Sequence, residues 1–345
     1  MINYKDYAKK YLPECLASLR QQSYPKDSFK VFIVDNATSP ETAAYLLATA
    51  PEAEIILEEK NSGFAEGNNL AMRRALDANY DYIVLFNMDT VADTEWLREL
   101  VTAAEADKQA GAIQSLLRLH PEKEKINSLG NQMHFLGFGF CKGYGEKISN
   151  LKPPISRPFF YASGASVLYP VKVLREVGIF DSEFFMYHED TDLSWRIRQA
   201  GYKVVLAEKS MMYHKYQFSR SILQFYYMER NRMIMMFENY RFGTLILIFL
   251  PFLFMELGML AYAAFRGMFW TKIRAYGYFF HAKNWRRMIK NKKAKAKLRK
   301  ISDRKLAGLI VGKLEFQEIA NPILKYVVNP VFNLYWRVVR NLIFW

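Results

Sequence analysis

Residues 30–50, KVFIVDNATSPETAAYLLATA, set the fold class of this 345-residue chain. A short apolar run ends on Asp35 and Asn36, and Ser-Pro-Glu then opens a helical stretch. The same order of strand, polar turn and helix recurs over 53–78, AEIILEEKNSGFAEGNNLAMRRALDA. It begins a third time at 80–90, YDYIVLFNMDT, ahead of an expected helix around 94–108. Strands that alternate with helices predict an α/β fold with a parallel sheet.

Polar side chains follow each of these expected strands. In a parallel sheet, ligands bind beyond the carboxyl ends of the strands, so Asp35, the loop 61–69 and the segment 87–89 are expected to share one site. Residues two apart on a strand point to the same side, so Asn87 and Asp89 project together. A carboxylate placed there can hold a hard divalent cation that also binds phosphate oxygens. Simple capping of a helix or turn explains Asp89 and Asp35 as well.

The loop NSGFAEGNN, residues 61–69, offers a surface for a phosphate or a base. Gly63 and Gly67 allow a close backbone approach, and Asn61 and Asn68 supply amide donors. A structural turn needs the same residue types, so both interpretations stay open.

The densest cluster of chemistry is HEDTDLSWRIRQAG, residues 188–201. Its apolar spacing and final glycine predict a short helix over about 191–200. A helix N-terminus stabilises an acid by about 0.3–1 kcal/mol, which accounts for one or two carboxylates. Three acids and a histidine lie within five positions, which indicates a bound cation or a group that accepts a proton. These four residues are His188, Glu189, Asp190 and Asp192. Arg196 has two interpretations, a phosphate contact or a pair with Asp192.

The charge distribution points to an anionic partner. The formal net charge is +14, and residues 266–304 hold 14 Lys or Arg and a single acid, Asp303. Cys15 and Cys141 lack metal-type spacing and are expected to be free thiols in a reducing compartment. The first residues contain no apolar signal segment, which predicts a catalytic part on the cytoplasmic side.

The C-terminal third is expected to associate with a membrane. Residues 245–264 carry only Glu256 as a charge, and a membrane span, an interfacial helix and a buried helix all stay open. The basic, aromatic-rich stretch that follows suits an anionic leaflet, and residues 326–345 look like a second amphipathic anchor. Single-stranded nucleic acid is the alternative partner, which the neighbouring apolar run disfavours.

Taken in order, these segments resemble the family 2 glycosyltransferases, and specifically their rhamnosyltransferase-like branch. The resemblance covers roughly residues 3–235 and rests on LPECLASLRQQSYP, VFIVDNAT, NSGFAEGNNLAM, DYIVLFNMDT, GIFDSEFFMYHEDTDLSWRIRQAGYKV and the later His214. It implies a GT-A fold, a mixed and mostly parallel sheet flanked by helices, for residues 1–235. Residues 236–345 are then a helical membrane-association region. It also implies inverting transfer from a nucleotide-diphosphate sugar, with Mg or Mn as cofactor.

The resemblance assigns roles position by position. Asp190 is the expected general base, which Glu189 and Asp192 orient, and Asp89 with His214 holds the metal. Asn87 stands where stricter members of the family have a second Asp. Donor binding falls to Asp35, Asn36, Asn61, Gly63, Phe64, Gly67, Asn68 and Asn87.

One departure from the family pattern concerns the first strand, which is largely missing ahead of Asn3-Tyr4. A form extended by that strand is expected to be more soluble and more active. The expected acceptor is a lipid-linked or cell-surface polysaccharide at the cytoplasmic face of the cell membrane, with peripheral or single-span attachment. A nucleotidyltransferase and a catalytically silent scaffold are the alternatives. The sequence does not identify the sugar, although rhamnose is a candidate, nor the nucleotide or the acceptor.

Overall fold

The computed structural model describes residues 1–152, 155, 158–216, 222–315 and 322–345. The strands are β1 (Ile2–Tyr4), β2 (Phe32–Asn36), β3 (Glu54–Glu58), β4 (Tyr82–Phe86), β5 (Thr90–Ala92), β6 (Ala110–Leu119), β7 (Ile126–Ser128), β8 (Asn131–Met133), β9 (Gly139–Cys141), β10 (Ser166–Pro170) and β11 (Lys203–His214). The helices are α1 (Tyr7–Arg20), α2 (Pro40–Thr49), α3 (Gly63–Asp77), α4 (Trp96–Ala106), α5 (Val171–Val177), α6 (Glu189–Gln199), α7 (Ile222–Asn239), α8 (Phe242–Phe265), α9 (Phe269–Gly277), α10 (Ala282–Leu298), α11 (Asp303–Ala307) and α12 (Asn329–Leu342).

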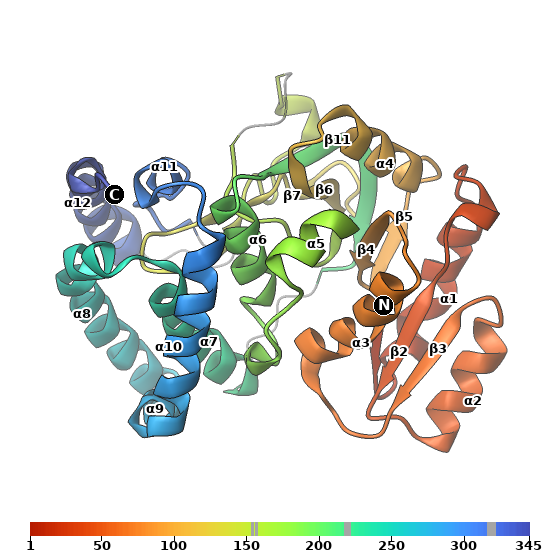
Figure 1. Cartoon of the computed structure of the whole chain (residues 1–345), viewed down its shortest axis with the longest axis horizontal. Helices are drawn as coiled ribbons and strands as arrows, with labels where there is room; N and C mark the ends of the chain where they lie inside the picture. Colours follow the sequence, from red (N-terminus) through yellow and green to blue (C-terminus); the bar gives the residue numbers. More distant parts are fainter. Residues whose placement is uncertain (153–154, 156–157, 217–221, 316–321) are drawn as a thin grey trace.

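The strands form two main sheets (Figure 1). The N-terminal sheet has the order β1-β2-β3, and both of its strand pairs are parallel, as the repeating strand–helix pattern predicts. The second sheet has the order β4-β10-β6-β11-β5, with β7 attached to β6. The α/β class and the flanking helices are therefore as expected.

The second sheet is less parallel than expected. β11 pairs with β6 in parallel, but β10 lies antiparallel between β4 and β6, and β5 and β7 are also antiparallel to their neighbours. The prediction of a mostly parallel sheet therefore holds only for the N-terminal half. An apolar strand such as β10, buried at every position, has the same sequence pattern in either direction, so the pattern could not reveal its orientation.

β1 is short, as expected from the sequence, and the two sheets are separated beside it. β1 pairs with β2 over three residues, from Ile2 opposite Val34 to Tyr4 opposite Asn36. A cavity of about 330 Å³ lies between the two sheets and is lined by Met1, by the start of β2 and by β4. We call this gap the seam. The benefit of an extended first strand stays a prediction.

Helix starts follow local chemistry where a cap is present. Ser39 caps α2 by accepting from the Thr42 amide, which places the helix start at the predicted Ser-Pro-Glu. The first turn of α1 is fixed by Asn3, whose Oδ1 accepts from the Ala8 amide (2.8 Å). The helix contains Pro13. α6 begins at Glu189, two residues before its predicted start.

The C-terminal helices pack onto the N-terminal part of the chain. In Figure 1, α8 to α12 lie at the end of the molecule opposite α2 and β3. The expected boundary at residues 235/236 falls inside α7, and one apolar cluster joins Phe135 and Trp195 to Ile248, Met288 and Trp336. The two parts therefore share a core. The division into two domains stays a prediction.

α8 is the one helix among the described residues that is long and apolar enough to cross a membrane, with 28% of its most apolar window buried. Glu256, the charge that complicated this segment, is not isolated. It accepts from Arg232 of α7 and Lys272 of α9, which also contact Glu229. Two buried cations thus balance two buried carboxylates. One side of α8 packs against the protein, while the apolar residues on its other side are exposed.

Candidate active site

The polar ends of β2 and the loop 61–63 are joined by hydrogen bonds. Asn36 Oδ1 accepts from the Ser62 amide (2.9 Å), while its Nδ2 donates to Asn61 Oδ1 and to the Gly63 carbonyl (3.1 Å each). Asn61 Oδ1 also accepts from the Gly63 amide (3.0 Å). The structure therefore brings Asn36, Asn61 and Gly63 together, as the strand-end argument expected.

Asp35 is fully buried and already has internal partners. Its Oδ1 accepts from Asn3 Nδ2 (2.7 Å), and its Oδ2 accepts from the hydroxyls of Thr38 and Thr42 (2.6 Å each). A carboxylate has about four lone-pair sites, so about one remains for a further donor. Asp35 thus fixes the turn between β2 and α2 and keeps limited capacity for a ligand.

The other residues of the loop 61–69 contact either α3 itself or neighbouring segments. Asn68 Nδ2 donates to the Phe64 carbonyl one turn back (2.9 Å), so this side chain is used within α3. Gly67 lies against β1, where an added Cβ would come within 3.3 Å of Ile2 Cδ1. The ring of Phe64 lies beside Gly164, on the loop before β10.

Gly63 allows the loop 61–63 to approach the residues that precede α6. Its φ is +81°, and a Cβ there would lie 2.5 Å from both the carbonyl oxygen and a ring carbon of Phe185. The Phe185 carbonyl accepts from the Ala65 amide (3.0 Å). Only glycine fits this contact, so Gly63 serves the junction between the loop and the residues that precede α6.

The segment before α6 is strained and is held by α7. Phe185, Tyr187 and His188 all have positive φ, between +61° and +70°, at a cost of roughly 1–3 kcal/mol each. Asn231 Nδ2 donates to the carbonyls of Phe184, Met186 and Tyr187 at 2.7–2.9 Å. These bonds keep the segment in place and position the acids that follow it.

Glu189 and Asp190 line a cavity of about 160 Å³. Asp190 Oδ2 accepts from the Gly164 amide (3.2 Å), and Oδ1 accepts from the Thr191 amide (2.6 Å). Burial raises the pKa of Asp190 despite these bonds. Burial, and then the charge of Asp190, raise the pKa of Glu189 far more, and Glu189 Oε2 has no hydrogen-bond partner among the described residues. Two buried carboxyl groups with raised pKa values are chemically able to share a proton.

Backbone bonds connect this pair with the segment after β4. Gly164 donates to Asp190, and the carbonyl of the next residue, Ala165, accepts from the Asn87 amide (3.1 Å). Asn87, Asp190 and Phe64 thus meet around two consecutive residues. The three separate sequence motifs are therefore neighbours in the fold.

Asp89 and His214 lie close together, as expected. His214 ends β11 opposite Thr90 of β5, and its Nε2 lies 3.4 Å from Asp89 Oδ1. His214 Nδ1 contacts Asn127 Oδ1 (3.0 Å), which orients the ring. Burial opposes ionisation of Asp89, but His214 and Tyr7 outweigh it and lower the pKa of that carboxyl.

This pair is compatible with a divalent cation. Asp89 Oδ1 is buried and has no hydrogen-bond partner in the part of the chain that the structure describes. The same residues contain no group of three or more His, Cys, Asp or Glu side chains placed to hold a metal. Mg²⁺ is commonly bound by one or two carboxylates and completes its shell with substrate phosphates and water. Asp89 would supply one such carboxylate, with the imidazole nitrogen of His214 beside it.

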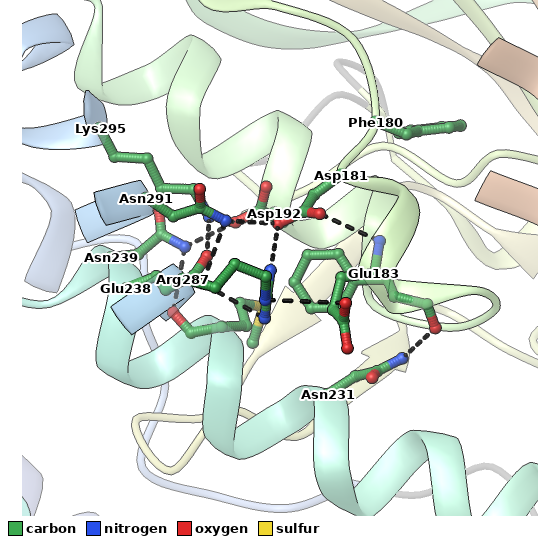
Figure 2. A network of polar contacts seen from close by, with 12 residues as sticks. Phe180, Asp181, Glu183, Asp192, Asn231, Glu238, Asn239, Arg287, Asn291 and Lys295 are labelled. Atoms are coloured by element: carbon green, nitrogen blue, oxygen red, sulfur yellow. Dashed lines mark hydrogen bonds and ion pairs between the residues drawn. The ribbon is translucent and has the colours of Figure 1, made fainter. Parts of the chain in front are cut away.

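Asp192 is not in the cavity with the other two acids. Its carboxylate accepts from Arg196 Nε (2.9 Å). It also accepts from Asn239 Nδ2 (2.7 Å) and from Lys295 Nζ (Figure 2). Lys295 also donates to Glu238 (2.6 Å). Burial works against ionisation, but these cations lower the pKa of Asp192 to about 2. Its position is thus one of support between α6, α7 and α10.

Arg196 is likewise occupied by the protein. Besides Asp192, its guanidinium donates to the carbonyls of Val177 (2.6 Å) and Ile179 (2.8 Å) at the end of α5. Of its two interpretations, the pair with Asp192 is the one that the structure shows.

Three positioning residues were not predicted from the sequence: Asn69, Asn231 and Lys295. Asn69 exchanges two hydrogen bonds with the backbone of Phe180 (2.9 and 3.1 Å), which ties α3 to the loop leading toward α6. Asn231 lies in a helix that buries several polar residues, and their burial is not visible in the sequence. Lys295 lies within a run of similar cations, so nothing in the sequence set it apart.

Comparisons with known proteins agree with this architecture. A sequence model of "Glycosyl transferase family 2" matches residues 1–176. The chain is 26% identical over 170 residues to the low-salt glycan biosynthesis hexosyltransferase Agl10 of Haloferax volcanii, covering 48% of this chain and 52% of that protein. It is 26% identical over 204 residues to an N-acetylglucosaminyl-diphospho-decaprenol L-rhamnosyltransferase of Mycobacterium tuberculosis, covering 54% and 66%. The chain thus spans between half and two thirds of these relatives.

Among solved structures, the fold is similar to that of the mannosyltransferase PcManGT from Pyrobaculum calidifontis in complex with GDP-Man and Mn²⁺. The TM-score is 0.50 at 14% identity, over 99% of this chain and 85% of that chain. This likeness supports a GT-A-like fold with a C-terminal helical region.

Proposed function

The chain belongs to glycosyltransferase family 2, whose sequence model covers residues 1–176, and on that premise we propose that it catalyses an inverting sugar transfer. The donor is a nucleotide-diphosphate sugar, and the acceptor is a lipid-linked or cell-surface polysaccharide intermediate. Rhamnose is one candidate sugar, since one relative is named an L-rhamnosyltransferase. The observation that carries the proposal is the meeting of Asn87, Phe64 and Asp190 at Gly164 and Ala165.

Asp190 acts as the general base. The acceptor hydroxyl oxygen forms a bond to the anomeric carbon while the bond from that carbon to the phosphate oxygen breaks. The hydroxyl proton passes to the Asp190 carboxylate, and the electron pair of the broken bond leaves with the diphosphate. Because burial raises the pKa of Asp190, this carboxylate is a stronger base than an exposed aspartate. Glu189 lines the same cavity and helps to orient the acceptor.

Asp89 and His214 are the residues that would hold Mg²⁺ or Mn²⁺. A cation bound there supplies positive charge for the departing diphosphate. Asn127 fixes the imidazole of His214, and the short β5–β11 ladder holds the two ligands in register.

Donor recognition is assigned to the loop between β3 and α3 and to the end of β2. Asp35 and Asn36 border the nucleoside, with Asn61 and Gly63 close to the phosphates. Phe64, Gly67 and Asn68 shape the start of α3 around them, and Asn87 faces the donor from the end of β4. The bonds within the loop support this assignment because they fix its backbone before a ligand arrives.

The protein is placed at the cytoplasmic face of a membrane by residues 236–345. Exposed apolar residues on α8 and α12 support association with the membrane interface. They are Phe249, Leu253 and Leu257 on α8, and Val331, Leu334 and Val338 on α12. Anionic lipid is the expected membrane partner.

The decisive experiment follows the products formed from a panel of nucleotide sugars by the full chain and by Asp190→Asn. Transfer should fall by roughly 10²–10⁴-fold in the variant while donor binding persists. Glu59→Gln, an exposed acid beside the donor loop, is the control and should be unchanged. Near-normal turnover in Asp190→Asn would remove the base assignment. Transfer of the nucleotidyl group with release of a sugar 1-phosphate would indicate a nucleotidyltransferase, and donor binding without any turnover by the unaltered chain would indicate a silent scaffold.

A further inference from the structure

A pocket of about 590 Å³ lies where two parallel strands of the larger sheet end. β6 ends at Leu119 and β11 ends at His214, and the residues that follow both strands form part of its wall. The first half of α1 and the turn after β9 supply other parts of the wall. Ligands of α/β proteins bind at this edge of a sheet, and the volume lies in the range of ligand pockets.

Aromatic rings and cations line this space. Three tyrosines contribute to the wall: Tyr11, Tyr144 and Tyr216. The rings of Tyr144 and Tyr216 meet edge to face, with their centroids 5.9 Å apart. Lys10 and Lys215, which also line the wall, lie over the ring of Tyr11, with Nζ 4.8 and 5.7 Å from its centroid. A tyrosine ring packs against the apolar face of a sugar ring, and its hydroxyl bonds to sugar hydroxyls. We call this space the tyrosine pocket.

The charges around the tyrosine pocket favour an anionic ligand. Lys215 donates to Glu14, whose carboxylate also lies 3.7 Å from His120 Nε2. Glu122, an acid in the wall, pairs with a lysine of its own turn at 2.5 Å. Lys10 is exposed and has no ion-pair or hydrogen-bond partner in the described ranges. Both acids are thus paired with lysines, and Lys10 is left to bind an anion.

The tyrosine pocket adjoins the candidate metal ligands. The ring of Tyr216 lies 5.5 Å from the imidazole of His214, centroid to centroid. The ring of Tyr11 lies 4.8 Å from that of Tyr7, whose hydroxyl bonds to Asp89. The pocket therefore begins beside the proposed position of the diphosphate. The proposed nucleoside contacts are at the end of β2, in the other sheet, so the nucleotide does not account for this space.

The tyrosine pocket is also a neighbour of the cavity that contains Asp190. Tyr161 lines that cavity. Burial, and then the charge of Asp190, raise the pKa of Tyr161, and Tyr216 contributes to the same shift. Asp190 and Tyr216 are therefore both within electrostatic reach of one buried hydroxyl. β9 gives a second connection, because Gly139 at its start lines the cavity and Tyr144, three residues after its end, lines the pocket.

We propose that the tyrosine pocket binds the part of the acceptor glycan next to the reacting sugar, and that this part carries an acidic substituent, a carboxylate or a phosphate, bound by Lys10. This inference rests on the proposed sugar transfer, because it names a subsite and a chemical class for the acceptor. Sugar units pack against the three tyrosines, while the reacting hydroxyl lies in the cavity of Asp190.

The first test measures binding to the full chain in non-ionic detergent by titration calorimetry, without nucleotide sugar. The probes are a tetrasaccharide of alternating glucuronic acid and N-acetylglucosamine, its carboxyl-reduced neutral form, and a tetramer of glycerol phosphate. At least one acidic probe should bind tenfold or more tightly than the neutral one, and comparison of the two acidic probes identifies the anion. Lys10→Met should remove this preference. Lys172→Met, which alters an exposed lysine of α5 outside the pocket and changes the net charge equally, should keep it.

A second variant tests the aromatic part of the wall. Tyr144→Ala should weaken binding of the acidic and the neutral tetrasaccharide alike, by about fivefold, because ring packing does not depend on charge. Equal binding of all three probes, no binding of any, or equal effects of Lys10→Met and Lys172→Met would overturn the proposal. If UDP or GDP displaces the acidic probe and Lys10→Met weakens nucleotide binding as much as probe binding, the pocket belongs to the nucleotide sugar and the proposal is also overturned.

Binding and transfer are read separately, so the two proposals fail in different ways. A preference for an acidic probe that Lys10→Met removes, with no turnover of any nucleotide sugar, would refute the transfer reaction and leave the glycan site intact. Normal transfer in which Lys10→Met leaves the KM for an acidic acceptor unchanged would refute the glycan site and leave the reaction intact.

Discussion

The ion network around Asp192 makes a quantitative prediction about stability. Lys295 is 5% exposed and contacts Asp192 and Glu238, which are 0% and 1% exposed. Lys295→Met keeps the aliphatic stem but leaves two carboxylates buried with less compensating charge. Breaking a buried pair in this way costs about 3–5 kcal/mol in the free energy of unfolding. The pKa of Asp192 measures the whole network, to which Arg196 and Asn239 also contribute: a fall from 3.8 to about 2 corresponds to roughly 2.4 kcal/mol at 1.36 kcal/mol per pKa unit.

The pH dependence of this effect has a definite sign. The folded-state pKa of Asp192 lies below its unfolded value, so its contribution is fully present above about pH 4 and is lost as the pH falls toward 2. The difference between Lys295→Met and the unaltered chain should therefore be largest near neutral pH and should narrow in acid. In acid, the carboxylates left behind by the substitution become neutral.

The assay is urea unfolding at several pH values, with Lys293→Met as the control. Lys293 lies on the same helix and is exposed, and the substitution changes the net charge equally. Its effect should stay within about 0.5 kcal/mol. If the two variants unfold at the same urea concentration at neutral pH, the network contributes nothing and the reasoning about Asp192 is wrong.

The remaining predictions concern the site. In thermal unfolding, Gly63→Ala should destabilise the protein by more than about 1 kcal/mol beyond the effect of Gly145→Ala. Both glycines have positive φ, but only at Gly63 would the added Cβ meet a neighbour, Phe185. Equal effects of the two substitutions would contradict the argument from this contact. Asn231→Leu should lower kcat at least tenfold with donor binding retained, since the strained segment before α6 loses three bonds, and an unchanged kcat in a folded variant would contradict this. Chelation with EDTA should abolish transfer and Mn²⁺ should restore it; full activity in EDTA would exclude the metal role of Asp89.

Much of the fold could be predicted from the sequence because the patterns that mark strand ends and helix starts are local. A strand that ends on Asp35-Asn36 and a helix that starts at Ser39 depend on neighbours a few residues away. The proximity of Asp89 and His214 was also expected, although it came from the family resemblance rather than from spacing. The structure places the two side chains 3.4 Å apart.

What the sequence could not show depends on distant partners. Asp192 has the same residue type and helix turn as Asp190, yet Lys295, 103 positions later, draws it into a structural network. Asn231 acts on carbonyls 44 to 47 positions earlier. Side-chain bonds to a distant backbone leave no periodic pattern, so a positioning residue of this kind looks like any buried polar residue.

The seam between the two sheets affects how the protein should respond to its donor. Asp35, Asn36 and the loop 61–63 belong to the three-stranded sheet, whereas Asn87 and Asp89 follow the outer strand of the larger one. Across the seam, the backbone ladder is interrupted beside β1. A donor bound to both sets of residues would act as a non-covalent cross-link. Saturating donor should therefore make the two halves unfold as one cooperative unit and slow amide exchange in β4, whose outer edge has no strand partner among the described residues.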